Sequence, residues 1–221
     1  MGDPMLKQLS LPGFEGPRKA TIQPRPWRPP DVKHGVFFAH FPESDAAVRA
    51  YSVAQGLCRK YGLLRQPLAA DRLHVSLAGF GEFPRVPPKL VRLLSDAASA
   101  VAVNAFDVSF DRVMTFGNRS DGRKRPTVLL CRDGSAELID LQKCLNAALA
   151  GVGLVRTSAF VPHVTLLYDH ATISEHAIDP VRWTVREFHL IDSLHGLTKH
   201  IRIGRWALEE KNQQSNMNSR L

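Results

Sequence analysis

Two short stretches of the sequence repeat one pattern: Leu73-His74-Val75-Ser76-Leu77-Ala78 and Pro162-His163-Val164-Thr165-Leu166-Leu167. Each reads histidine, valine, hydroxyl residue, leucine, inside an apolar run that is typical of a β-strand. Side chains alternate along a strand, so the histidine and the hydroxyl residue share one face, opposite the valine and the leucine. Each stretch therefore predicts a strand that buries one face and offers an imidazole and a hydroxyl on the other.

This pair of motifs suits chemistry on a phosphodiester. An imidazole titrates near neutral pH, so one histidine can start neutral and take a proton from the attacking group while the other gives a proton to the departing oxygen. We assign these tasks to His74 and His163, as catalytic residues. The hydroxyls of Ser76 and Thr165 can donate hydrogen bonds to the phosphate oxygens, where negative charge builds up. The chemistry requires no metal and no cofactor.

A single triplet of this kind is usually structural, because H-x-S and H-x-T are common by chance. A third one, His170-Ala171-Thr172, lies beyond the apolar strand, so it lacks the strand context of the other two. The two good motifs occupy the same position in a repeated unit, and this repetition favours function. Zinc is not expected, because the sequence has no H-x-x-x-H pair and no cysteine with a matching partner.

Helices and strands mix around the motifs without strict alternation. The hydrophobic pattern predicts strands at 36–39, 73–78, 106–116, 127–131, 161–168, 182–193 and 200–208, and helices at 44–61, 87–102 and 135–150. This order favours an α+β fold with antiparallel sheets over a doubly wound parallel sheet. Each half contains a strand, a helix and then a strand that carries a histidine, so we expect a pseudo-two-fold duplication.

The bulk composition fits one globular unit with anionic partners. The chain has 221 residues, 44% hydrophobic and 23% charged, with a formal net charge of +8 and a pI of about 9.8. A basic surplus attracts phosphates. Seven prolines predict that residues 1–33 form an extension, followed by a domain at 34–208 and a polar tail at 209–221.

The expected location follows from the apolar runs and the cysteines. The longest apolar runs are too short to cross a bilayer, and the N-terminus does not resemble a secretory signal. The three cysteines, Cys58, Cys131 and Cys144, cannot all pair within one chain, and we expect reduced, buried thiols. The sequence therefore predicts a cytoplasmic protein, without a membrane partner.

The segment 34–208 resembles the LigT-like members of the two-histidine phosphoesterase superfamily. This group includes the bacterial RNA 2′,3′-cyclic phosphodiesterases, historically called 2′-5′ RNA ligases. The matching stretches are the two motifs, 36–42, 125–129, 188–193 and 204–206. The resemblance implies a bilobal fold in which two antiparallel sheets with flanking helices form a central cleft that holds both motifs. It also implies that His74 is the proton donor and His163 the acceptor.

The resemblance has departures, and the sequence offers lesser candidates for substrate binding. Ser76 stands where threonine is common, and Tyr168 stands where RNA cyclic phosphodiesterases often carry a basic residue. Phe41 and Tyr168 are candidates for stacking on a base. Arg125 belongs to a basic cluster in a predicted hairpin loop, with Arg119, Arg123 and Lys124, which is either a solvated loop or a phosphate clamp.

The function predicted from the sequence is hydrolysis of a 2′,3′-cyclic phosphate, on an RNA end or a nucleotide, by a monomer that needs no metal. Two alternatives stay open. The first is 2′-5′ RNA ligation or 2′,5′-phosphodiester cleavage, because one acid–base pair serves both directions of the reaction. The second is a non-catalytic module that binds nucleotides or RNA on the same fold, although intact histidines in both motifs argue against it.

Overall fold

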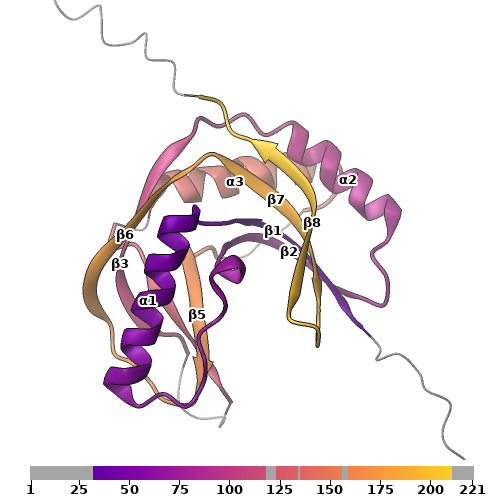
Figure 1. Ribbon diagram of the computed structural model, residues 1–221. Helices are drawn as coiled ribbons and strands as arrows, with labels where there is room; N and C mark the ends of the chain where they lie inside the picture. Colours follow the sequence, from indigo (N-terminus) through magenta and orange to yellow (C-terminus); the bar gives the residue numbers. More distant parts are fainter. Residues whose placement is uncertain (1–31, 118–122, 134, 156–158, 211–221) are drawn as a thin grey trace, which may run out of the picture. The chain divides into compact units, whose positions relative to one another are not determined.

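The strands of the described chain form one eight-stranded antiparallel sheet, in the order β6-β3-β4-β5-β2-β1-β7-β8 (Figure 1). In chain order the strands are β1 His34–His40, β2 Val75–Phe83, β3 Phe106–Thr115, β4 Arg125–Leu130, β5 His163–Asp169, β6 His176–Val185, β7 Glu187–Leu194 and β8 Lys199–Ala207. The helices are α1 Ser44–Tyr61, the 3-10 helix η1 Ala70–Arg72, α2 Pro88–Ser99 and α3 Ala136–Gly151. The predicted α+β class with antiparallel pairing is therefore confirmed.

The structure is a computed structural model, and it describes residues 32–117, 123–133, 135–155 and 159–210. All of these lie in one unit, Asp31–Leu221. Most of the predicted extension at 1–33, most of the predicted tail at 209–221, and Arg119 of the basic loop fall outside the described residues. The domain boundaries stay predictions. In the described ranges, no helix is both long and apolar enough to cross a membrane.

The two halves of the sheet meet at a narrow seam. β2 and β5 are neighbours, and of the described residues only Val75 and Val164 pair across them. Every other pair of neighbouring strands has at least four paired residues, as between β3 and β4. The predicted arrangement of two sheets therefore differs from the structure, in which two four-stranded halves join into one sheet through this backbone bridge. The pseudo-two-fold duplication stays a prediction.

Helices from each half cover strands of the other half. α1 follows β1 but contacts β5 and β6, whereas α3 follows β4 but contacts β2 and α2. α1 buries small and apolar side chains at helical spacing, namely Ala46, Ala50, Ala54 and Leu57. It ends at Gly62, whose φ of 62° lies in the left-handed region that favours glycine. This exchange of helices ties the halves together where the strands alone meet at one pair.

Two details of the sequence prediction were wrong. The single strand expected at 182–193 is two strands, β6 and β7, which lie in different halves of the sheet (Figure 1). The chain crosses between the halves at Arg186, where no glycine or proline breaks the apolar alternation. The three cysteines are free thiols, but Cys144 is exposed and the other two are half-buried. Cys144 lies on the outer face of α3, so burial was the wrong expectation there.

Candidate active site

The seam pair places the four motif residues on one face of the sheet. Val75 and Val164 are fully buried, so the residues that flank them on each strand point away from the core. Extending the antiparallel register by one residue puts His74 opposite Thr165 and Ser76 opposite His163. Diagonal neighbours in such a pair lie roughly 7–8 Å apart, so the two imidazoles can flank one phosphate.

Each predicted catalytic histidine is held by the same backbone contact. Nδ1 of His74 donates to the carbonyl of Arg72 at 2.7 Å, and Nδ1 of His163 donates to the carbonyl of Val161 at 2.8 Å. Both contacts reach back two residues, at the point where each strand begins. Because Nδ1 is occupied, Nε2 of each ring is the atom that accepts or donates a proton.

Aromatic rings surround His74. Phe37 lies with its ring centroid 5.2 Å from that of His74, Phe41 at 5.7 Å, and a further imidazole, that of His200, at 5.2 Å. Burial lowers the pKa of His74 below its ordinary value. The positive charges of Arg72 and His163 lower it further, while the hydrogen bond to the Arg72 carbonyl opposes the shift. The free site therefore favours the neutral imidazole at His74.

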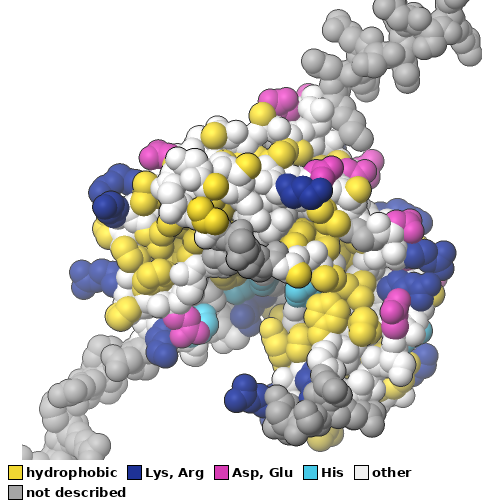
Figure 2. All heavy atoms as spheres, turned by 180° about the vertical axis from the view of Figure 1, so that it is seen from behind, with side chains coloured by type: hydrophobic (Ala, Val, Ile, Leu, Met, Phe, Trp, Pro, Cys, Tyr) yellow, Lys and Arg dark blue, Asp and Glu magenta, His cyan; other side chains and the backbone are white. Residues whose placement is uncertain are grey.

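His163 lies in a more open environment. The ring of Phe116 meets it edge to face, at 5.0 Å between centroids. Neither Ser76 nor Thr165 has a side-chain hydrogen bond to a described residue, so both hydroxyls are available to a ligand. Histidine side chains lie inside a hollow of the face seen in Figure 2, between areas of hydrophobic side chains.

Sequence reasoning missed four residues that surround the histidines: Phe37, Phe116, Arg72 and His200. Phe37 is the neighbour of Phe38 on β1, and only alternation distinguishes the buried Phe38 from the half-buried Phe37. The other three belong to segments without a recognisable motif. His200 comes from β8, which no pattern connects to β2, so sequence reasoning had no signal for it.

The three lesser candidates for substrate binding lie in different environments. Phe41 contacts His74, and the guanidinium of Arg202 stacks over its ring at 4.5 Å. Tyr168 is 48% exposed, near the end of β5. Arg125 is buried at the start of β4, where it pairs in register with Asp169, so it does not extend freely from the loop as a solvated clamp residue. The substrate-binding roles of Phe41, Tyr168 and Arg125 stay predictions.

Several other histidines have structural partners. His40 is buried, donates from Nδ1 to the carbonyl of Glu187 and accepts the indole N–H of Trp183 at Nε2. His34 pairs with Asp192 at 2.9 Å. The third triplet begins at His170, just beyond the end of β5, as its sequence context indicated. Within the described ranges, no three histidine, cysteine or acidic side chains lie together as metal ligands would.

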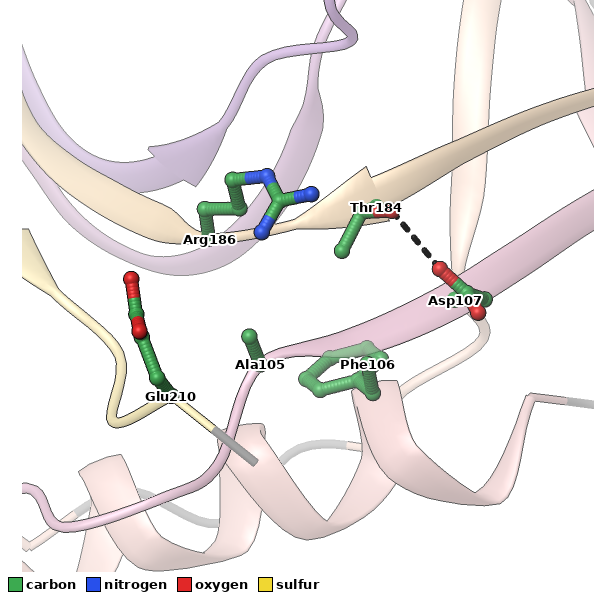
Figure 3. A pocket seen from close by; sticks show the side chains of 6 residues that line it. All are labelled: Ala105, Phe106, Asp107, Thr184, Arg186 and Glu210. Carbon is green, nitrogen blue, oxygen red and sulfur yellow. Dashed lines mark hydrogen bonds between the residues drawn. The ribbon is translucent and has the colours of Figure 1, made fainter. Parts of the chain in front are cut away.

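A separate hollow of about 390 Å³ lies beside the paired residues at the start of β3 and the end of β6 (Figure 3). Thr184 donates a hydrogen bond to Asp107 at one end of it, at 2.7 Å, while Arg186 and Glu210 lie toward its other end. None of the four motif residues lines it. The residues of the two motifs therefore lie at the seam, apart from this hollow.

Comparisons with known proteins identify the family of this chain. The chain is 30% identical over 150 residues to the RNA 2′,3′-cyclic phosphodiesterase of Escherichia coli K12, across 66% of this chain and 81% of that protein. The crystal structure of E. coli LigT in its apo form superposes with a TM-score of 0.63 at 26% identity, and covers 80% of this chain and 99% of its own.

Two further solved structures extend the comparison. E. coli LigT in complex with 3′-AMP has a TM-score of 0.61 at 26% identity, over 80% of this chain and 98% of that one. TT0787 of Thermus thermophilus shares the fold, with a TM-score of 0.63 at 17% identity, over 80% of this chain and all of that one. The sequence model of the 2′-5′ RNA ligase superfamily matches residues 42–197, most of the described unit. The chain therefore belongs to the 2′-5′ RNA ligase superfamily.

Proposed function

We propose that this protein hydrolyses the 2′,3′-cyclic phosphate of an RNA end or a nucleotide by acid–base catalysis from His74 and His163. The observation that carries the proposal is the pairing of Val75 with Val164. It groups two imidazoles and two hydroxyls on one face of the sheet. The similarity to an RNA 2′,3′-cyclic phosphodiesterase supports this choice of substrate.

The reaction assigns one proton transfer to each ring. Nε2 of neutral His163 takes a proton from water as the water oxygen bonds to phosphorus. Nε2–H of protonated His74 gives its proton to the ribose oxygen whose bond to phosphorus breaks. The product is a phosphomonoester beside a free ribose hydroxyl, and each transfer contributes roughly 10²–10⁴-fold to the rate.

The environment of His74 adds a requirement to this scheme. Because burial and nearby positive charge favour its neutral form, His74 must gain a proton when the substrate binds. The negative charge of the phosphodiester favours that protonation. Binding of the anionic substrate then prepares the proton donor. If His74 and His163 have the opposite roles, the neutral free form of His74 is already the base.

The hydroxyls of Ser76 and Thr165 stabilise the phosphate. Each lies opposite the histidine of the other strand in the extended register. From there it can donate to a non-bridging oxygen, where charge develops as the water oxygen attacks. The pairing of each hydroxyl with the imidazole of the neighbouring strand is why we assign both motifs to one phosphate.

The nucleoside lies, in this proposal, against Phe41. A hollow of about 270 Å³ beside this ring is lined by α1, η1 and β8, and contains Arg202 and Asp71. A flat ring with a stacked guanidinium offers a surface on which any base can stack. We assign weaker roles to Tyr168 and Arg125. The free cysteines fit action in the cytoplasm, where thiols stay reduced, and we propose that the protein acts as a monomer.

The test is hydrolysis of the four 2′,3′-cyclic nucleotides in the presence of EDTA, with product regiochemistry read by ³¹P NMR. The proposal expects one regioisomer of nucleoside monophosphate at a rate that EDTA leaves unchanged. Activity that is lost on chelation and restored by zinc or manganese would favour Lewis-acid catalysis instead. Tight binding of nucleotides without turnover would indicate the binding module.

Ligation is the second candidate, and the family description favours testing it. A 5′-hydroxyl of a second RNA would replace water as the attacking group, and the same two imidazoles would exchange protons with it. Incubation of an RNA carrying a 2′,3′-cyclic phosphate with an RNA carrying a 5′-hydroxyl distinguishes the two: a 2′-5′ linked product supports ligation, and a 5′-hydroxyl RNA left unjoined excludes it.

A further inference from the structure

A third imidazole lies against His74. The rings of His200 and His74 meet edge to face, with centroids 5.2 Å apart and an angle of 77° between planes. Phe37 touches both rings, at 5.2 Å from His74 and 5.6 Å from His200. Phe41 is 5.7 Å from His74 and 6.5 Å from His200. His200 is thus packed into the ring cluster that surrounds a proposed catalytic group.

This contact does not follow from the order of the strands. His200 lies on β8, which is separated from β2 by β1 and β7. Three strand spacings in a flat sheet span roughly 14 Å. The sheet must therefore curve toward the face that holds the motifs for the two rings to touch. Arg202, the residue two places further along β8, stacks on Phe41 from the same direction.

The protonation state of His200 follows from its burial. Its Nδ1 is buried and has no hydrogen-bond partner among the described residues. A buried N–H without a partner is rarer than a buried acceptor without one, so Nδ1 is the nitrogen without a proton. Burial, together with the charges of His74 and Arg72, lowers the pKa of His200 to about 4. The ring is thus neutral at pH 7, with its single proton on Nε2.

We propose that His200 is a further substrate-binding residue of this site, whose Nε2–H donates a hydrogen bond to an oxygen of the phosphate held by His74. The identity of that ligand rests on the proposed function. A neutral donor is suited to this position. It supplies a hydrogen bond to the anion without placing a second positive charge against the ring of His74 when that ring is protonated.

The alternative is that His200 only packs against Phe37 and His74, and a conservative substitution separates the two. His200→Phe keeps a ring for packing but removes the donor, whereas His200→Gln keeps an N–H donor and removes the ring. His176→Phe is the matched control. His176 has the same backward contact as the motif histidines, from Nδ1 to the carbonyl of Ser174 at 2.9 Å, and also touches an aromatic ring, that of Tyr61, but lies on β6.

The assay is kcat and KM on 2′,3′-cyclic AMP, from pH 5 to 8. His200→Phe should lower kcat/KM about 10- to 100-fold, the size expected for a lost hydrogen bond to an anion. His200→Gln should recover part of the loss, and His176→Phe should behave as the unaltered protein does. A His200→Phe variant within twofold of the unaltered protein overturns the proposal, and so does a His200→Gln variant that is no better than His200→Phe.

A binding measurement keeps the inference separate from the proposed reaction. In the unaltered protein with ¹⁵N-labelled histidine, titration with 3′-AMP should shift the Nε2 resonance of His200 together with those of His74 and His163. Saturating 3′-AMP that moves the two motif histidines but leaves His200 unchanged overturns the proposal. If no phosphodiester is hydrolysed, the proposed function fails, and this titration still decides whether His200 contacts the phosphate.

Discussion

Val164→Ala should lower catalysis in a protein that stays folded. Val164 is fully buried and pairs with Val75 across the seam and with Leu129 on β4. Removing two methyl-sized groups costs about 1.6 kcal/mol of transfer free energy, and the cavity left behind raises the loss of unfolding free energy to about 2–3 kcal/mol. For a chain of this length, Tm should fall by about 5–10 °C.

The loss of catalysis should come from the site and not from unfolding. The protein stays folded at 25 °C, but relaxation at the seam shifts His74 and His163 relative to each other. A displacement of about 1 Å can cost about 10²-fold in rate, so we expect kcat on 2′,3′-cyclic AMP to fall at least tenfold. Val185→Ala is the matched control, because Val185 is equally buried but lies at the end of β6.

Thermal unfolding followed by circular dichroism gives the change in Tm, and initial rates at 25 °C give the change in kcat. The two variants should lose similar stability and differ in kcat. Equal values of kcat in Val164→Ala and Val185→Ala would refute the reasoning, since the seam would then not position the site. A Tm that does not change in either variant would show that the burial of these valines was overestimated.

Three further predictions concern His74, the two motif hydroxyls and His40. The pKa of His74 lies below 6.5 in the free protein, so the protonated donor is lost as pH rises through that pKa. We therefore expect kcat/KM, which reports the free protein, to fall with rising pH from below pH 6.5, and kcat to fall at higher pH. A fall of kcat/KM that begins only above pH 7 would contradict this. Ser76→Ala and Thr165→Ala should each lower kcat by less than about 10²–10³-fold, the loss when one oxyanion-hole donor is removed, as a single-turnover assay would show. Burial lowers the pKa of His40 to about 4 in the folded protein, so the unfolded chain binds its proton first as pH falls. The free energy of unfolding should therefore drop by about 3 kcal/mol between pH 6.5 and pH 4. In urea unfolding experiments, His40→Gln should make the free energy of unfolding depend less on pH over this range.

The sequence predicted the local structure well because its signals are local. α1 was predicted at the same residues as observed, since the apolar spacing along the helix marks its length. The alternation in both motifs correctly placed Val75 and Val164 in the core. The crossing between β6 and β7 was missed because Arg186 interrupts neither the apolar alternation nor the strand propensity around it.

The rest of the site depends on contacts between distant strands. Periodicity shows which residues share a face of a strand, but it does not show which strands are neighbours. The pairing of β2 with β5 therefore had to come from the resemblance or the structure. The same holds for His200, which reaches His74 only because the sheet curves. Arg119 of the basic loop and most of the terminal segments fall outside the described residues, so those interpretations stay predictions.

The most direct test of the central claim compares His74→Ala, His163→Ala and the double variant on 2′,3′-cyclic AMP in EDTA, with full pH profiles. Each single variant should lose about two to four orders of magnitude in kcat, and the double variant should be little worse, because the two rings act on one phosphate as a unit. With His74 as donor, its variant should lose the fall in rate at high pH, and the His163 variant the fall at low pH. Losses that multiply in the double variant, or single variants as active as the unaltered protein, would contradict the account.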